Sequence, residues 1–198
     1  LSITSVGFPA STSTDWKIEG VGDFNGDGKA DLVWRNSSEG TTAIWLMNGM
    51  TLAASGFPGG VPLEWQIAGV GDVDGDSKAD VIWRHSISGT VAVWLMNGLS
   101  ITSVGFPAST STDWKIGGVG DFNGDGKADL IWKNDTSDIM AIWLMNGASI
   151  SSSGVLGGLV SDLEIEQVGD TNGDRKADVV WMNKTTGTVE VWRMNGLA

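Results

Sequence analysis

Hydrophobic and polar positions follow short runs along the chain. Residues 16–22 alternate large and small side chains, residues 31–36 are apolar on both faces, and residues 41–47 form a third apolar run. Residues 50–57 make a weaker, serine-rich run. Alternation with a period of two, and apolar runs this short, are typical of strands rather than helices. The pattern therefore predicts a group of four short strands.

This group returns along the whole chain with a period of 49 residues, without insertion or deletion. Two tryptophan positions mark the period, one in the second strand and one in the third: Trp34, Trp83, Trp132 and Trp181, and Trp45, Trp94, Trp143 and Trp192. Repeats 1–49 and 99–147 agree at 40 of 49 positions, which indicates recent duplication or engineering. The frames 1–49, 50–98, 99–147 and 148–196 make residues 1–198 one unit of four repeats. A fixed period of this length is typical of a solenoid or a propeller.

The turns and the buried strands favour a propeller. Asn-Gly pairs join the third strand to the fourth at Asn48-Gly49, Asn97-Gly98, Asn146-Gly147 and Asn195-Gly196. Asn-Gly is the preferred pair for a two-residue hairpin turn. Strands that are apolar on both faces need cover on both sides, which stacked propeller blades provide. We predict an all-β propeller of four-stranded antiparallel blades, four per chain.

The ends of the repeat pattern suggest how the propeller closes. Residues 1–8 read as a strand of the fourth type, and residues 189–194 as a strand of the third type. The last blade then lacks an outer strand that the N-terminal strand can supply. Pairing the two removes unpaired sheet edges. We therefore expect the N-terminal strand to close the last blade.

Charge and composition exclude several classes of protein. The 24 Asp and Glu residues against 12 Lys and Arg residues give a net charge of -12, which a phosphate backbone would repel. No apolar stretch approaches the roughly 20 residues of a membrane helix. The chain has no Cys and no Tyr, and one His. We expect neither nucleic-acid binding nor membrane insertion.

Four acidic loops of nine residues carry the candidate chemistry, one between the first and second strand of each repeat. Thirteen of the 24 acidic residues lie in these loops, with side-chain oxygens at positions 1, 3, 5 and 9 and Lys at position 7. Oxygens at 1, 3 and 5, a carbonyl at 7 and a Gly at 6 match the front half of a calcium loop. Trp stands at position 12, where an EF-hand has Glu, so a helical EF-hand is excluded. Clustered Asp, Asn and Gly also occur in ordinary turns, but four copies at constant spacing favour calcium over that reading.

The predicted ligands are side-chain oxygens, with the Lys contributing only its carbonyl. They are Asp23, Asn25, Asp27, Lys29 and Asp31; Asp72, Asp74, Asp76, Lys78 and Asp80; Asp121, Asn123, Asp125, Lys127 and Asp129; and Asp170, Asn172, Asp174, Lys176 and Asp178. Up to four Ca²⁺ ions per chain are expected. Loops two and four have Ser77 and Arg175 where the others have Gly, so we expect a strained positive φ or a different turn there.

The runs GVGDFNGDGKADLVW at 20–34 and AIWLMNG at 43–49 resemble FG-GAP/VCBS repeats, the blades of calcium-binding propellers such as integrin α-subunit heads and some lectins. The resemblance covers the whole chain. It implies a secreted or extracellular recognition propeller, commonly of about seven blades, with calcium in its loops. It does not specify the ligand, because the family shares a scaffold and differs in partners.

The remaining tryptophans divide into two groups. The second-strand and third-strand Trp residues are expected between the blades. Trp16, Trp65 and Trp114 open the innermost strands, and they are the candidate ligand-binding positions; Leu163 takes that place in the fourth repeat. Arg35 and Arg84 are expected to be solvated charges.

Three classes of function remain open. The first is a binding module of the lectin or adhesion type, a propeller that recognises carbohydrate or a cell-surface ligand through repeated sites between blades. The second is an engineered or recently amplified scaffold with no ligand but calcium. The third, a polysaccharide-active enzyme, is disfavoured because catalysis needs a few distinct residues at one asymmetric site. We expect no catalytic residues.

The assembly state is the last expectation. Four blades closing a ring alone must each turn by about 90°, whereas eight turn by about 45°, close to the roughly 51° of seven-bladed relatives. This geometry favours a homodimer that forms one eight-bladed ring. Closure within one chain stays open as an alternative, because it avoids the entropic cost of association.

Overall fold

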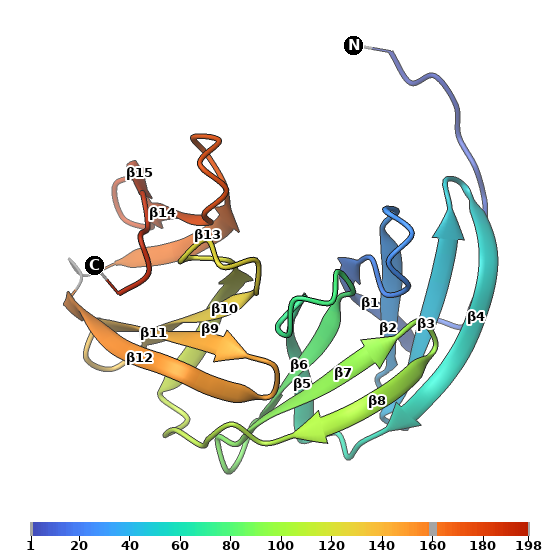
Figure 1. The fold of residues 1–198 in the computed structure, drawn as a ribbon, viewed down its shortest axis with the longest axis horizontal. Coiled ribbons are helices and arrows are strands. Elements are labelled where there is room, and N and C mark those ends of the chain that lie inside the picture. Colours follow the sequence, from blue (N-terminus) through green and yellow to red (C-terminus); the bar gives the residue numbers. More distant parts are fainter. Residues whose placement is uncertain (1, 159–161, 198) are drawn as a thin grey trace.

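The computed structural model describes residues 2–158 and 162–197, and every regular element in those ranges is a β-strand (Figure 1). The strands form three four-stranded sheets and one three-stranded sheet, all antiparallel and each built from strands consecutive in sequence. No helix long and apolar enough to cross a membrane occurs in the described ranges. The predicted all-β fold with one sheet per repeat is confirmed.

Each sheet is one blade, and the strand bounds follow the 49-residue period. Blade 1 contains β1 (Trp16–Gly22), β2 (Asp31–Asn36), β3 (Thr41–Asn48) and β4 (Thr51–Gly60). Blade 2 contains β5 (Trp65–Gly71), β6 (Asp80–His85), β7 (Val91–Asn97) and β8 (Ser100–Gly105). Blade 3 contains β9 (Trp114–Gly120), β10 (Asp129–Asn134), β11 (Ile139–Asn146) and β12 (Ser149–Gly158). Blade 4 contains β13 (Leu163–Gly169), β14 (Asp178–Asn183) and β15 (Val189–Trp192).

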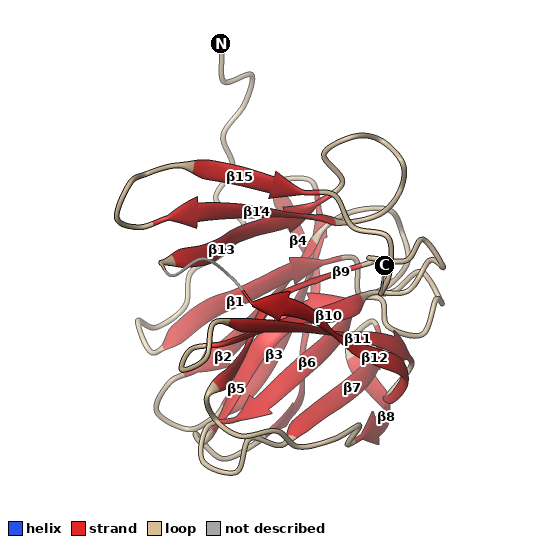
Figure 2. Ribbon diagram, turned by 90° about the vertical axis from the view of Figure 1, so that its left-hand side faces the viewer, coloured by secondary structure: helices blue, strands red, loops and turns tan. Residues whose placement is uncertain are grey.

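The blades follow one another around a common axis, as in a propeller. The first strands, β1, β5, β9 and β13, lie innermost, and β1, β5 and β9 each contact the first strand of the next blade (Figures 1 and 2). The third and fourth strands lie progressively further out. Gly49, Gly98, Gly147 and Gly196 of the Asn-Gly turns have φ between 62° and 64°, which is the conformation that the hairpin prediction requires.

The hydrophobic core lies between blades. Trp83, Trp132 and Trp181 of the second strands are no more than 1% exposed. Each packs on the third-strand Trp of its own blade at centroid distances of 4.6 to 5.2 Å. These residues join apolar side chains of the preceding blade in one cluster per junction. The expectation that these tryptophans form the inter-blade core is therefore met in blades 2 to 4, whereas Trp34 and Trp45 of blade 1 are half-buried and belong to none of these clusters.

Two arginines tie blades together, contrary to the expectation of solvated charges. The Arg35 guanidinium is buried, lies 4.9 Å from the Trp83 ring centroid, and donates to the carbonyls of Gly40, Val61 and Pro62. Arg84 repeats the arrangement one blade further on, 5.0 Å from the Trp132 ring. Desolvation lowers the pKa of both groups. The prediction was wrong because two of the three carbonyls bonded by Arg35, those of Val61 and Pro62, lie about half a repeat away in sequence.

Blade 4 has three strands, so its outer position beside β15 is open, which is consistent with completion by an N-terminal strand. Leu1 lies outside the described residues. Residues 2–13 form no strand within this chain, and they run away from blade 4 along the outer side of blade 1 (Figure 1).

Candidate functional site

The acidic loops connect the innermost strand of each blade to its second strand. In all four loops, the carboxylate at position 1 accepts hydrogen bonds from backbone N–H groups later in the loop. Asp23 accepts hydrogen bonds from the backbone N–H groups of Gly26 at 2.7 Å and Gly28 at 2.6 Å. Asp72, Asp121 and Asp170 do the same in their loops. The first carboxylate therefore fixes the turn through hydrogen bonds within the loop.

Position 5 is exposed in all four loops, and positions 3 and 7 on either side of it are exposed or half-buried. The Asn25 side-chain oxygen accepts from the Asp27 N–H at 2.9 Å. Asp27 in turn accepts from the Lys29 N–H, and its other oxygen pairs with Lys29 Nζ at 3.0 Å. Asp76 and Lys78 form the same ion pair at 2.7 Å. In loops one and two, a cation at position 5 would compete with this lysine.

Position 9 holds a buried aspartate that links three segments of its blade. Asp31 is 0% exposed, and its two oxygens accept from the backbone N–H groups of Phe24 at 3.0 Å and Met47 at 2.8 Å. Asp80, Asp129 and Asp178 make the equivalent bonds. The loop pattern alone did not indicate that this aspartate has a structural role. The sequence feature that could have indicated it is the position of the aspartate at the start of an apolar strand.

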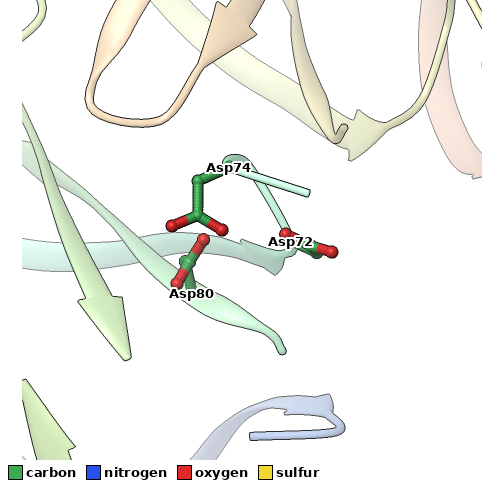
Figure 3. A group of neighbouring side chains, drawn as sticks. All are labelled: Asp72, Asp74 and Asp80. Carbon is green, nitrogen blue, oxygen red and sulfur yellow. The ribbon is translucent and has the colours of Figure 1, made fainter. Parts of the chain in front are cut away.

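Loop two brings three carboxylates together (Figure 3). Ligand oxygens of Asp72, Asp74 and Asp80 lie within 4.8 Å of one another. Desolvation by burial raises the pKa of Asp80 to about 7, against the lowering effect of its backbone hydrogen bonds. Desolvation also raises the pKa of Asp74, and the charges of Asp76 and Asp72 add to this shift. This cluster has the oxygen chemistry of a site for a hard divalent cation.

The predicted strain in loops two and four is present. Ser77 has φ 67° and Arg175 has φ 68°, where Gly28 and Gly126 have φ 80° and 83°. A left-handed conformation costs a side-chain-bearing residue roughly 1–2 kcal/mol. Both residues nevertheless donate their N–H to the first aspartate of the loop, as the glycines do. The loop therefore keeps its shape without glycine.

The candidate ligand-binding tryptophans are half-buried at the start of their strands. Trp65 lines a groove of about 320 Å³ between blades 1 and 2, together with Glu19, Arg35, Ser37, Leu63, Gln66 and Ile67. Trp16 lines a hollow on blade 1 with Trp34 and Trp45. Trp114 packs against the core between blades 2 and 3. The structure thus brings one of the three, Trp65, into a groove between blades that polar side chains also line.

The groove repeats two blades further on with different chemistry. Between blades 3 and 4, a smaller hollow of about 180 Å³ is lined by Lys115, Gly117, Lys133, Asp135, Glu164 and Ile165. All of these positions except Lys115 correspond to those of the first groove after two periods. Leu163, at the Trp65 position, is 2% exposed and offers no aromatic surface.

Comparison with known proteins supports the reading of the repeats. The model of a family described as FG-GAP-like repeat matches residues 23–83 and 72–132. Each match runs from one acidic loop to the second strand of the following blade. No curated protein matches the chain.

Proposed function

Because the chain belongs to the FG-GAP-like repeat family, we propose that it is a calcium-stabilised propeller that binds carbohydrate outside the cell. A propeller of such repeats fits a binding or adhesion scaffold. The observation that carries the carbohydrate proposal is the groove beside Trp65, between blades 1 and 2. The calcium part is supported separately by the carboxylate cluster of loop two.

The loop residues fit a calcium ion. Oxygen donors alone line the cluster, and Ca²⁺ prefers carboxylate and carbonyl oxygens. In loop two, the clustered Asp72, Asp74 and Asp80 would hold the ion. The side chain of Asp76 and the carbonyl of Lys78 are the other ligands predicted from the sequence, and Asp80 also accepts two backbone hydrogen bonds. A bound ion would reduce repulsion among carboxylates in a chain whose net charge is -12.

Calcium dependence is tested by thermal unfolding in chelator and in 10 mM Ca²⁺. The loops have no bidentate Glu, so we expect weak sites with Kd on the order of 10⁻⁴ to 10⁻³ M. Each such site would then stabilise the fold by about 1.4–2.7 kcal/mol at this concentration. Equal melting temperatures in chelator, Ca²⁺ and Mg²⁺ would remove calcium from the proposal.

The groove chemistry suits a sugar. The half-buried Trp65 ring offers an apolar surface, and Glu19 and Gln66 are exposed polar side chains at its sides. Arg35 is committed to blade carbonyls, so it shapes the groove rather than reaching a ligand. We propose binding without catalysis, since His85, the single histidine, accepts hydrogen bonds from the Ser88 turn.

A glycan array in calcium, probed with the original chain, Trp65→Ala and Trp65→Phe, tests the carbohydrate proposal. We expect binding that the alanine variant loses about tenfold or more and that the phenylalanine variant largely keeps. Binding that is indifferent to Trp65 would place the site elsewhere. An array without hits at high protein density would favour a scaffold whose only ligand is calcium.

A further inference from the structure

Three junctions between successive blades are built from the same positions. At each, an inner-strand glycine faces an alanine of the next blade, in the pairs Gly22 and Ala79, Gly71 and Ala128, and Gly120 and Ala177. The same alanines donate their N–H to a loop carbonyl of the preceding blade at 2.6–2.7 Å. The Asn-Gly turn of the following blade adds a second bond through Gly98, Gly147 and Gly196, at 2.7–2.8 Å. A junction thus has two defined faces, which we call leading, on the earlier blade, and trailing, on the later one.

The leading face of blade 4 is uncovered. Val191 is 51% exposed, whereas the equivalent Ile44, Val93 and Ile142 of the other blades are fully buried. A Cβ built on Gly169 meets no atom within 4 Å, although this glycine takes the place of Gly71. The face therefore has the shape of a junction, but no blade of this chain packs on it.

The trailing face of blade 1 is uncovered in the matching way. Ile18 and Val21 are 52% and 56% exposed, while their counterparts in the later blades are partly buried. Gly49 is exposed, although the glycines of the three later Asn-Gly turns are buried. Among the described residues, no hydrogen bond joins blade 4 to blade 1. The chain therefore carries both halves of a fourth junction, and they do not meet.

The N-terminal segment occupies the place of an outer strand of a preceding blade. Residues 1–18 have the same sequence as residues 99–116, which include β8. A Cβ on Gly7 would lie 2.5 Å from Met50 Cβ, just as one on Gly105 would lie 2.3 Å from Ala148 Cβ. Yet Ile3, Val6 and Phe8 are 83%, 67% and 92% exposed. The segment lies beside blade 1 without the inner strands that would cover it.

We propose that a second copy of this chain supplies what is missing, so that two copies form one eight-bladed propeller. The leading face of blade 4 in each copy would cover the trailing face of blade 1 in the other. Residues 2–7 of each copy would pair with β15 of the other, as β8 pairs with β7. A two-fold rotation then closes both junctions and leaves no open edge. This inference does not depend on the proposed calcium or carbohydrate binding.

Surface area and chemistry agree with a second copy. The chain exposes 9867 Å², against about 8,900 Å² expected for a monomer of its mass. The leading face of blade 4 carries Thr171 and Arg193, where the other blades have Phe or Val and Leu. This more polar face makes the junction between copies weaker than those within the chain. The copies should therefore separate before the blades unfold.

Light scattering coupled to gel filtration tests the proposal directly. We expect a mass of about twice 20.8 kDa at 10 µM protein. A mass of one chain at this concentration would overturn the proposal, and so would a polydisperse mass above two chains, which means open-ended assembly. Val191→Asp and Val21→Asp, one on each open face, should both give monomers. Ile87→Asp, at a more exposed residue of the β6–β7 turn, should remain dimeric.

Engineered cysteines separate the second copy from closure within one chain. Leu95 of β7 pairs with Ser103 of β8, so the equivalent pair after two periods is Arg193 and Ser5. The chain has no cysteine of its own, which makes a disulfide in the Ser5→Cys, Arg193→Cys double variant unambiguous. On a non-reducing denaturing gel, we expect a band at two chains. A band at one chain, together with the absence of free thiols, would mean that the disulfide forms within the chain. Blade 4 would then pair with the N-terminal segment of its own chain, which would overturn the proposal.

Discussion

Close packing between blades can be tested with one substitution at two equivalent glycines. A Cβ at Gly71 would lie 2.8 Å from both Ala128 Cβ and Val119 Cγ1, whereas a Cβ at Gly169 meets nothing within 4 Å. Neither glycine has a positive φ, so alanine fits the backbone at both. The pair therefore isolates the effect of the neighbouring blade.

The magnitude follows from the distances. Carbon atoms pack best at about 3.5–4.0 Å, so blades 2 and 3 must separate by roughly 0.7 Å or more to accept Gly71→Ala. Overpacking of this kind costs about 1–3 kcal/mol, and the stiffer unfolded chain offsets about 0.4–1 kcal/mol of it. We expect a net loss of about 1–2 kcal/mol. Gly169→Ala should be neutral or slightly stabilising.

Urea unfolding followed by tryptophan fluorescence measures both changes, with each substitution placed in the Val191→Asp chain so that assembly does not contribute. If Gly71→Ala is as stable as Gly169→Ala in that background, the account of the junction is wrong. Without Val191→Asp, Gly169→Ala should also weaken the dimer, because the alanine would then face the partner subunit.

Further substitutions test the bonds within and between blades. Arg35→Ala should lower the free energy of unfolding by about 2–4 kcal/mol, because three carbonyls lose a charged donor; Lys17→Ala on the exposed side of β1 is the control, and urea unfolding measures both. Asp31→Ala should cost a similar amount in chelator, because two buried N–H groups lose their acceptor, while the exposed Asp27→Ala should change stability by less than about 0.5 kcal/mol. Ser77→Gly should stabilise the chain by about 0.5–1 kcal/mol by relieving the positive φ, and an unchanged urea midpoint would contradict that strain.

The strands and their order were predictable because the information for them is local. The second-strand bounds at 31–36 match β2, and the Asn-Gly pairs adopt the positive φ that their turn requires. Because the period is fixed, the strand prediction for one blade applied to all four. The positive φ of Ser77 and Arg175 was predictable for the same reason, because the conformation at position 6 is set by the neighbouring residues of the loop.

The contacts between blades were less accessible to sequence reasoning. Arg35 reads as a surface charge in its strand, and two of its three carbonyl partners lie 26 and 27 residues away, in the linker from β4 to the next blade. Asp31 reads as the last ligand of its loop, and its bond to Met47 depends on how β2 and β3 align. The groove beside Trp65 likewise combines residues of two blades. The bonds of Arg35 to Val61 and Pro62 and the groove beside Trp65 follow from how successive blades pack, and the Asp31 bond follows from strand alignment within blade 1; the repeat pattern specifies neither.

Calcium binding by the acidic loops is the central functional claim, and native mass spectrometry of the chain with and without Ca²⁺ measures it most directly. The account predicts up to four ions per chain, with one fewer in the Asp72→Asn, Asp74→Asn variant of loop two. Spectra that show no bound calcium at millimolar Ca²⁺, or an ion count that this double variant leaves unchanged, would contradict it.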